Sequence, residues 1–137
     1  MGCDIHSYVE VQNKDGIWRA MTEVDFRPFV SYSPGMPVIH PFYSRDYRLF
    51  SHLAGVRGSL QEALSAPRGI PQDVSAFVRA RSDEYGVDGH SHSWLGLDEL
   101  LSCEYIVGTY FRNLAYMWLL EPGGDKELVR VVFWFDN

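Results

Sequence analysis

The chain has 137 residues and carries 12 Lys and Arg against 18 Asp and Glu, which gives a formal net charge of −6. Its hydrophobic content of 46% predicts a single globular domain over residues 1–137, large enough to bury a core. The two cysteines are too few for a disulfide framework. No apolar run is long enough for a transmembrane helix, and the first residues lack a signal-peptide pattern, so we expect a cytoplasmic protein without a membrane partner.

The basic residues are ten arginines and only two lysines. Arginine offers a planar fork of donors that suits phosphate, so this excess favours a small anionic ligand. The alternative explanation is a GC-rich genome, whose codon composition favours Arg over Lys. The acidic balance argues against a partner in bulk nucleic acid.

The first part of the chain predicts a β-hairpin. Residues 4–12 alternate with period two, which places Ile5, Val9 and Val11 on the core side of a strand. Residues 13–16 form a turn sequence that ends in Asp-Gly, and residues 17–23 return as a second strand. The opposite face of the first strand then carries four polar side chains in a row: Asp4, His6, Tyr8 and Glu10.

The middle of the chain predicts a long loop followed by helices. Residues 25–43 contain four prolines among aromatic residues and cannot form a continuous helix or central strand. A helix is expected from Ser44 as N-cap to Gly58, and a short helix from the capping box of residues 59–62. Another helix is expected to begin at Pro71.

The last third predicts a loop, helices and a buried strand. Residues 86–93 are polar and punctuated by glycine, residues 97–101 suggest a helix, and residues 105–120 favour mostly helix. Residues 128–135 are β-branched and aromatic, which predicts a strand that pairs centrally with the N-terminal hairpin. The expected fold class is α+β: a small antiparallel or mixed sheet, made of the hairpin and the C-terminal strand, packed with several helices and a long proline/aromatic loop.

Two clusters of carboxylate and imidazole carry the candidate chemistry: Asp4 with His6, and Asp88 with His90 and His92. If they converge, these five residues supply general acid and base groups for a phosphodiester. Asp4, His6, Asp88 and His90 are also a ligand set for a divalent metal that activates water. The alternative is that each histidine is an ordinary surface or hydrogen-bonded residue; His40, His52 and Cys3 are assigned to ordinary structural positions.

Three arginines and one tryptophan are candidate ligand-binding residues. Arg45 lies at a predicted helix start, Arg57 near that helix's end, and Arg68 in a turn between Pro67 and Gly69. Trp94 can stack a nucleobase or lie in the core. Salt bridges with the acidic residues are the alternative for these arginines and the expectation for four others: Arg79, Arg81, Arg112 and Arg130.

Several blocks of the chain resemble a family of small bacteriophage proteins that begin Met-Gly-Cys-Asp-Ile-His. These blocks are residues 1–6 with Glu10, 44–57, 67–71, 88–95 and 129–137, and they span nearly the whole chain. Asp46 and Gly96 depart from the asparagine and threonine usual in that family, and neither is a candidate site residue. The resemblance implies a phage product in the host bacterial cytoplasm and no settled activity.

Three functions follow as hypotheses. The first is a phosphodiesterase that degrades a cyclic oligonucleotide defence signal. The second is a non-enzymatic sponge that binds and sequesters such a signal. The third is an inhibitor that binds a host protein through the proline/aromatic loop. The sequence leaves the oligomeric state open, a homo-oligomer included, and does not decide whether a divalent metal takes part.

Overall fold

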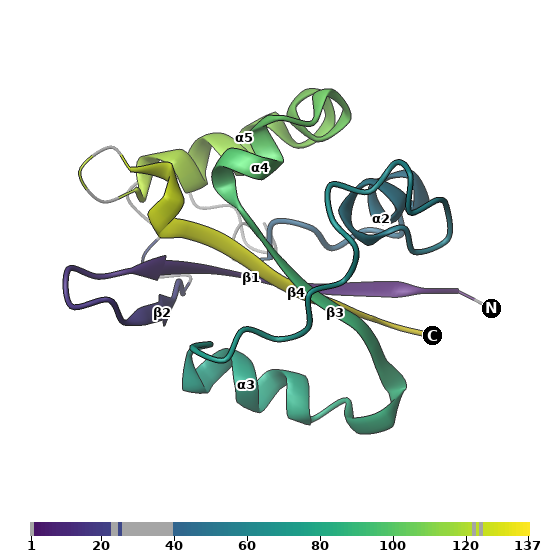
Figure 1. The fold of residues 1–137 in the computed structure, drawn as a ribbon, viewed down its shortest axis with the longest axis horizontal. Coiled ribbons are helices and arrows are strands. Elements are labelled where there is room, and N and C mark those ends of the chain that lie inside the picture. The colour runs from purple at the N-terminus through teal and green to yellow at the C-terminus, as the bar shows by residue number, and fades with distance from the viewer. Residues whose placement is uncertain (1, 23–24, 26–39, 122, 124) are drawn as a thin grey trace.

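A computed structural model describes residues 2–22, 25, 40–121, 123 and 125–137 (Figure 1). Its centre is an antiparallel sheet of four strands in the order β2-β1-β4-β3. The strands are β1 (Asp4–Gln12), β2 (Trp18–Ala20), β3 (Gly89–Gly96) and β4 (Val129–Asp136). The architecture confirms the predicted α+β class. The expected proline/aromatic loop falls largely on residues 26–39, which lie outside the described residues.

Helices cover both faces of the sheet (Figure 1). One face packs against α2 (Tyr47–Ala54), α4 (Leu97–Leu101) and α5 (Glu104–Leu119), and the other against α3 (Ala76–Asp83). The short 3-10 turns η2 (Gly86–Asp88) and η4 (Lys126–Leu128) lead into β3 and β4. Among the described residues, no helix is both long and apolar enough to cross a membrane.

The N-terminal hairpin has the predicted alternation. Ile5 and Val9 are buried on the α2/α5 face, whereas His6 and Tyr8 lie on the α3 face. The Asn13 side-chain oxygen accepts hydrogen bonds from the backbone N–H of Asp15 and Ile17 (2.9 and 3.0 Å), which closes the turn. The return strand is shorter than predicted, because β2 comprises only Trp18–Ala20.

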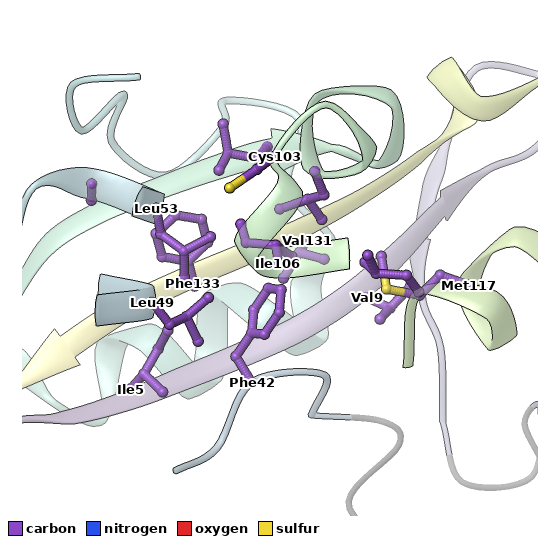
Figure 2. Packing of buried hydrophobic residues seen from close by; sticks show 14 of the residues in the cluster. Ile5, Val9, Phe42, Leu49, Leu53, Cys103, Ile106, Met117, Val131 and Phe133 are labelled. Carbon is purple, nitrogen blue, oxygen red and sulfur yellow. The ribbon is translucent and has the colours of Figure 1, made fainter. Parts of the chain in front are cut away.

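β4 is one of the two central strands and pairs with β1 of the hairpin, as predicted, and residues 129–135 are all buried. Its aromatic side chains alternate between the two layers: Phe133 and Phe135 join the α2/α5 core, whereas Trp134 joins the smaller cluster under α3. Figure 2 shows Phe133 and Val131 of β4 close to Leu53 and Ile106 of the covering helices. Burial on both faces explains why this segment reads as an almost continuous apolar run.

The boundaries of α2 differ from the prediction. The N-cap is Asp46 rather than Ser44, and its Oδ1 accepts a hydrogen bond from the Leu49 N–H at 3.1 Å. The helix ends at Gly55, whose φ of 74° places it in the left-handed region, and not at Gly58. The second oxygen of Asp46 accepts hydrogen bonds from the hydroxyls of Tyr105 and Tyr110 (2.6 and 2.8 Å), so one carboxylate caps α2 and ties it to α5.

The short helix predicted to begin at the capping box of residues 59–62 and to end before Pro67 does not form, because the Glu62 carboxylate binds Ser51 instead of capping it. Ser51 donates to Glu62 at 2.9 Å and accepts from the Ser59 N–H at 3.1 Å, which holds this segment as turns against α2. The helix expected from Pro71 begins later, at Ala76, with Ser75 as its N-cap. The Ser75 N–H donates to Glu10 of β1 at 2.8 Å and so fixes that start.

A buried ion pair joins β1 to β4 beneath the segment that leads into α3. Arg130 Nε donates to Glu10 at 2.9 Å, and Arg130 Nη1 donates to Asp73 at 3.0 Å. The Glu10 side chain is 0% exposed and that of Arg130 is 5% exposed. The expectation that Arg130 makes a surface salt bridge is therefore wrong, because pairing with β1 and β3 places it in the middle of the sheet.

We predict that Glu10→Gln lowers the free energy of unfolding by about 3 kcal/mol, since removing one partner of a buried pair leaves the other charge less compensated. Denaturant unfolding at neutral pH measures this loss. Glu84→Gln is the matched control, because the Arg81–Glu84 pair is roughly half-exposed at 45% and 58%. That control should change stability by less than about 0.5 kcal/mol, and an equal loss in both variants would contradict the prediction.

Candidate functional site

The two predicted Asp-x-His segments flank the same end of the central strand. Asp4 of β1 pairs with Asp136 of β4, and Asp136 pairs with Gly89 of β3. Two segments more than 80 residues apart in sequence therefore lie on either side of the last residues of β4. We call this region the strand end. It contains the beginnings of β1 and β3 and the end of β4 (Figure 1).

His6 lies between a hydroxyl and a carboxylate at the strand end. Its Nδ1 is 3.0 Å from the Tyr85 hydroxyl, and its Nε2 is 3.3 Å from Asp136 Oδ1. The ring packs on Tyr85 with centroids 4.2 Å apart. Burial, and then the charge of Asp136, raise the pKa of the Tyr85 hydroxyl above its usual value. Neither Tyr85 nor Asp136 was identified from the sequence, because each is an ordinary residue until the fold brings it to His6.

His90 and His92 lie on opposite faces of the sheet. The polar loop predicted at 86–93 is wrong: from Gly89 onward this segment is the edge strand β3, which pairs with β4. The register shifts between His90 and Ser93, and Ser91 has a φ of 54°, so a bulge interrupts the alternation. His90 stacks near Phe135 (centroids 6.1 Å apart) and His92 near Trp134 (6.0 Å).

This split prevents the predicted metal ligands from gathering. His90 is on the α2 side, His6 is on the α3 side, and Asp88 is exposed in η2. Within the part of the chain that the structure describes, no group of three or more His, Cys, Asp or Glu side chains is arranged to hold a metal ion.

Buried polar atoms without hydrogen bonds concentrate at the strand end. Among the described residues six buried side-chain atoms lack a partner, and four of them are here: His6 Nε2, His90 Nε2, Trp134 Nε1 and Asp136 Oδ1. Most buried polar atoms in folded proteins are satisfied, so such a concentration requires an explanation. The contact between His6 Nε2 and Asp136 Oδ1 is close without having hydrogen-bond geometry. Three of these atoms lie on the α3 face, whereas His90 Nε2 lies on the other face.

Two cavities open beside His6 and share the side chains of Tyr8 and His40. The first, of about 370 Å³, is also lined by Asp4 and His6. The second, of about 380 Å³, is also lined by Tyr85 and by a further cation, Arg81. The His40 Nδ1 lies 2.9 Å from the Ser7 carbonyl oxygen, to which it donates, so Nε2 carries the lone pair of the neutral ring. Local sequence patterns assigned His40 to an ordinary structural position and Arg81 to a surface salt bridge, because neither pattern shows the cavities that the fold forms beside them.

Arg45 reaches the strand end and is paired there. It donates to both oxygens of Asp4, from Nε at 2.7 Å and from Nη2 at 3.2 Å. This hydrogen bond and charge lower the pKa of the Asp4 carboxyl, which is half-exposed. Arg57 lies over the Tyr47 ring at 5.1 Å, and Tyr47 in turn accepts a hydrogen bond from the backbone of Cys3.

Arg68 and Trp94 belong to another part of the molecule. The Arg68 guanidinium donates to both oxygens of Glu99 in α4 (2.8 and 2.6 Å) and lies over the Trp94 ring at 4.5 Å. Trp94 pairs in register with Val132, well before the end of β4. Of the nine residues predicted for the site, the fold brings Asp4, His6, His90, His92 and Arg45 to the strand end, with His90 on the face opposite His6. Asp88 is exposed in η2 just before β3, Arg57 lies over Tyr47, and Arg68 and Trp94 lie away from the strand end.

Comparison with known proteins adds no relative: no family model, curated protein or solved structure matches this chain.

We predict that His92 becomes protonated only below its usual pKa of 6.5, because burial and then the neighbouring His90 lower its pKa in the folded state. The unfolded chain then binds more protons below pH 6.5, so His92 makes the protein lose stability as the pH falls through that value. Denaturant unfolding at several pH values should show a smaller loss between about pH 7 and pH 5 in His92→Gln. An NMR titration with the His92 pKa at or above 6.5 would contradict this.

Proposed function

We propose that this protein is a metal-independent phosphodiesterase that hydrolyses a cyclic oligonucleotide, and that it is a phage product acting in the host cytoplasm. The observation that carries the proposal is the position of His6 between Tyr85 and Asp136, beside cavities that also hold the imidazole of His40. Phosphodiester hydrolysis needs one group that takes a proton from water and another that gives a proton to the leaving oxygen.

His40 is the candidate general base. Its Nδ1–H is held by the Ser7 carbonyl, which leaves Nε2 to accept a proton from the attacking water. His40 lines both cavities beside His6, so the same ring serves a substrate that extends from one cavity into the other.

Tyr85 is the candidate general acid, and His6 is its proton source. The Tyr85 hydroxyl is protonated at neutral pH and can give its proton to the leaving oxygen. Protonated His6 then returns a proton from Nδ1 across the 3.0 Å contact, and the Asp136 carboxylate stabilises the imidazolium. His40 releases to solvent the proton that it took from water, and His6 takes a proton back from solvent, so both rings return to their starting states and the protons balance over one turnover.

Two arginines support binding of the phosphate groups. Arg81 lines the cavity that holds Tyr85 and His40, and is roughly half-exposed in its pair with Glu84. Arg45 pairs with Asp4, which lines the other cavity, and a phosphate bound beside Asp4 can take its place as the bidentate partner of Arg45. Tyr8 offers an aromatic ring to both cavities, and a base can stack on it.

The test is incubation of the protein with cyclic dinucleotides and trinucleotides in the presence of a chelator, followed by chromatography. Linear products are expected, and Tyr85→Phe and His6→Gln should each lower their rate by about a hundredfold or more. His52→Gln is the matched control, since His52 stacks on Tyr105 at 5.3 Å on the opposite side of the sheet and should keep full activity.

The same experiment decides between the alternatives. Depletion of an intact nucleotide, recovered after denaturation, indicates a sponge that uses the same cavities for binding alone. No depletion and no product with any nucleotide contradicts a nucleotide function and favours the inhibitor of a host protein. Product formation that His52→Gln lowers as strongly as His6→Gln contradicts the assignment of the strand end.

A further inference from the structure

We infer that the opposite end of the α3 face holds a separate binding site for an organic cation of the diamine or polyamine class. This site is a groove of about 590 Å³ whose lining includes Trp18, Trp94, Asp73, Glu127 and Arg130. Gln12 also lines it, and lies six residues along β1 from His6, which is about 20 Å at the rise of an extended strand. The groove is therefore distinct from the strand end, and this inference does not rest on the proposed function.

A guanidinium of the protein itself packs against the aromatic rings of the groove. The Arg130 guanidinium carbon lies 3.8 Å from the centroid of the Trp18 ring and 5.9 Å from that of Trp94. Arg68 lies over Trp94 at 4.5 Å, so cations and indoles alternate along this part of the sheet. Both indoles are only partly buried, and both line the groove. Indole rings attract cations through their negative faces, most strongly where water is partly excluded.

The charges around the groove favour a further positive charge. Arg130 is neutralised by Glu10, with 2.8 Å between their nearest atoms, and by Asp73 at 3.0 Å. Arg68 is neutralised by Glu99. Glu127 adds another carboxylate to the wall, and the Asp73 side chain is 61% exposed. The lining itself holds two carboxylates, Asp73 and Glu127, for the single Arg130 guanidinium. The buried Glu10 offsets the charge of Arg130 from beneath, so the groove repels phosphates and attracts ammonium groups.

The shape and polarity of the lining favour a flexible linear amine. The carboxylates of Asp73 and Glu127 accept hydrogen bonds from ammonium groups, and the amides of Gln12 and Gln72 supply further acceptors. The indoles and Pro71 give an apolar surface for the methylene segments between those groups. A small metal ion would gain nothing from this apolar surface, whereas a polyamine uses both parts of the lining.

Spermidine is the probe that tests this inference. In low-salt buffer, spermidine should shift the indole N–H signals of Trp18 and Trp94 in NMR spectra and leave that of Trp134, in the cluster under α3, unchanged. Glu127→Gln should weaken binding by about threefold to fivefold, as the loss of one exposed charge interaction predicts. Raising the salt concentration to about 0.3 M should weaken it further.

Three controls make the inference falsifiable. Glu104→Gln removes an exposed carboxylate from α5, on the other side of the sheet, and should leave spermidine affinity unchanged. Trp18→Leu should weaken spermidine binding more than it weakens Mg²⁺ binding, because only the amine uses the indole surface. The unfolding curve of this variant shows whether the protein still folds. The inference is overturned if spermidine does not bind, or if Glu104→Gln and Glu127→Gln lower spermidine affinity equally. It is also overturned if neutral maltotriose or adenosine binds more tightly than spermidine.

Discussion

The structure depends on the antiparallel pairing of β4 between β1 and β3. β1 pairs with β4 over eight residues, from Asp4 opposite Asp136 to Val11 opposite Val129. This register places every apolar side chain of β4 in one of two cores, with Phe133 under α2 and α5 and Trp134 under α3. A slip by one residue would exchange the two faces and expose both sets, so burial of both faces fixes the register.

That register also produces the candidate site. Asp136 comes to lie beside His6, and Gly89 beside Asp136, only because β4 ends where β1 and β3 begin. The α3 face supplies the remaining part, since Tyr85 follows α3 and its hydroxyl reaches the imidazole of His6. The polar groups of the strand end thus come from β1, β4 and the segment after α3, and the pairing of β1 with the buried β4 holds His6 and Asp136 in place.

The arginines take three physical roles in the fold. Arg130 is buried and holds β1, β4 and the segment before α3 together through Glu10 and Asp73. Arg68 holds β3 against α4 through Glu99. Arg45 and Arg81 remain roughly half-exposed beside cavities. The excess of arginine over lysine therefore reflects internal bidentate pairing and stacking on indole rings as much as contacts with a ligand.

The sequence alone determined the elements that local chemistry controls. Period-two alternation identified β1, the Asp-Gly turn identified the hairpin, and continuous apolar composition identified β4 as central. It also placed α5 and proposed His6 as a functional residue. It missed the strand character of residues 89–93, because an edge strand with a bulge at Ser91 has polar residues and glycines in the pattern of a loop.

Only the tertiary structure decided which of the candidate residues meet. The bulge turned His90 and His92 to opposite faces, whereas simple alternation would have kept both on one face. Long-range pairing brought Asp136, Tyr85 and His40 to His6 and placed Arg68 with Glu99. Local sequence patterns specify φ, ψ and burial periodicity, but a site made by residues 33 to 130 positions apart depends on strand register and packing, which no local pattern contains.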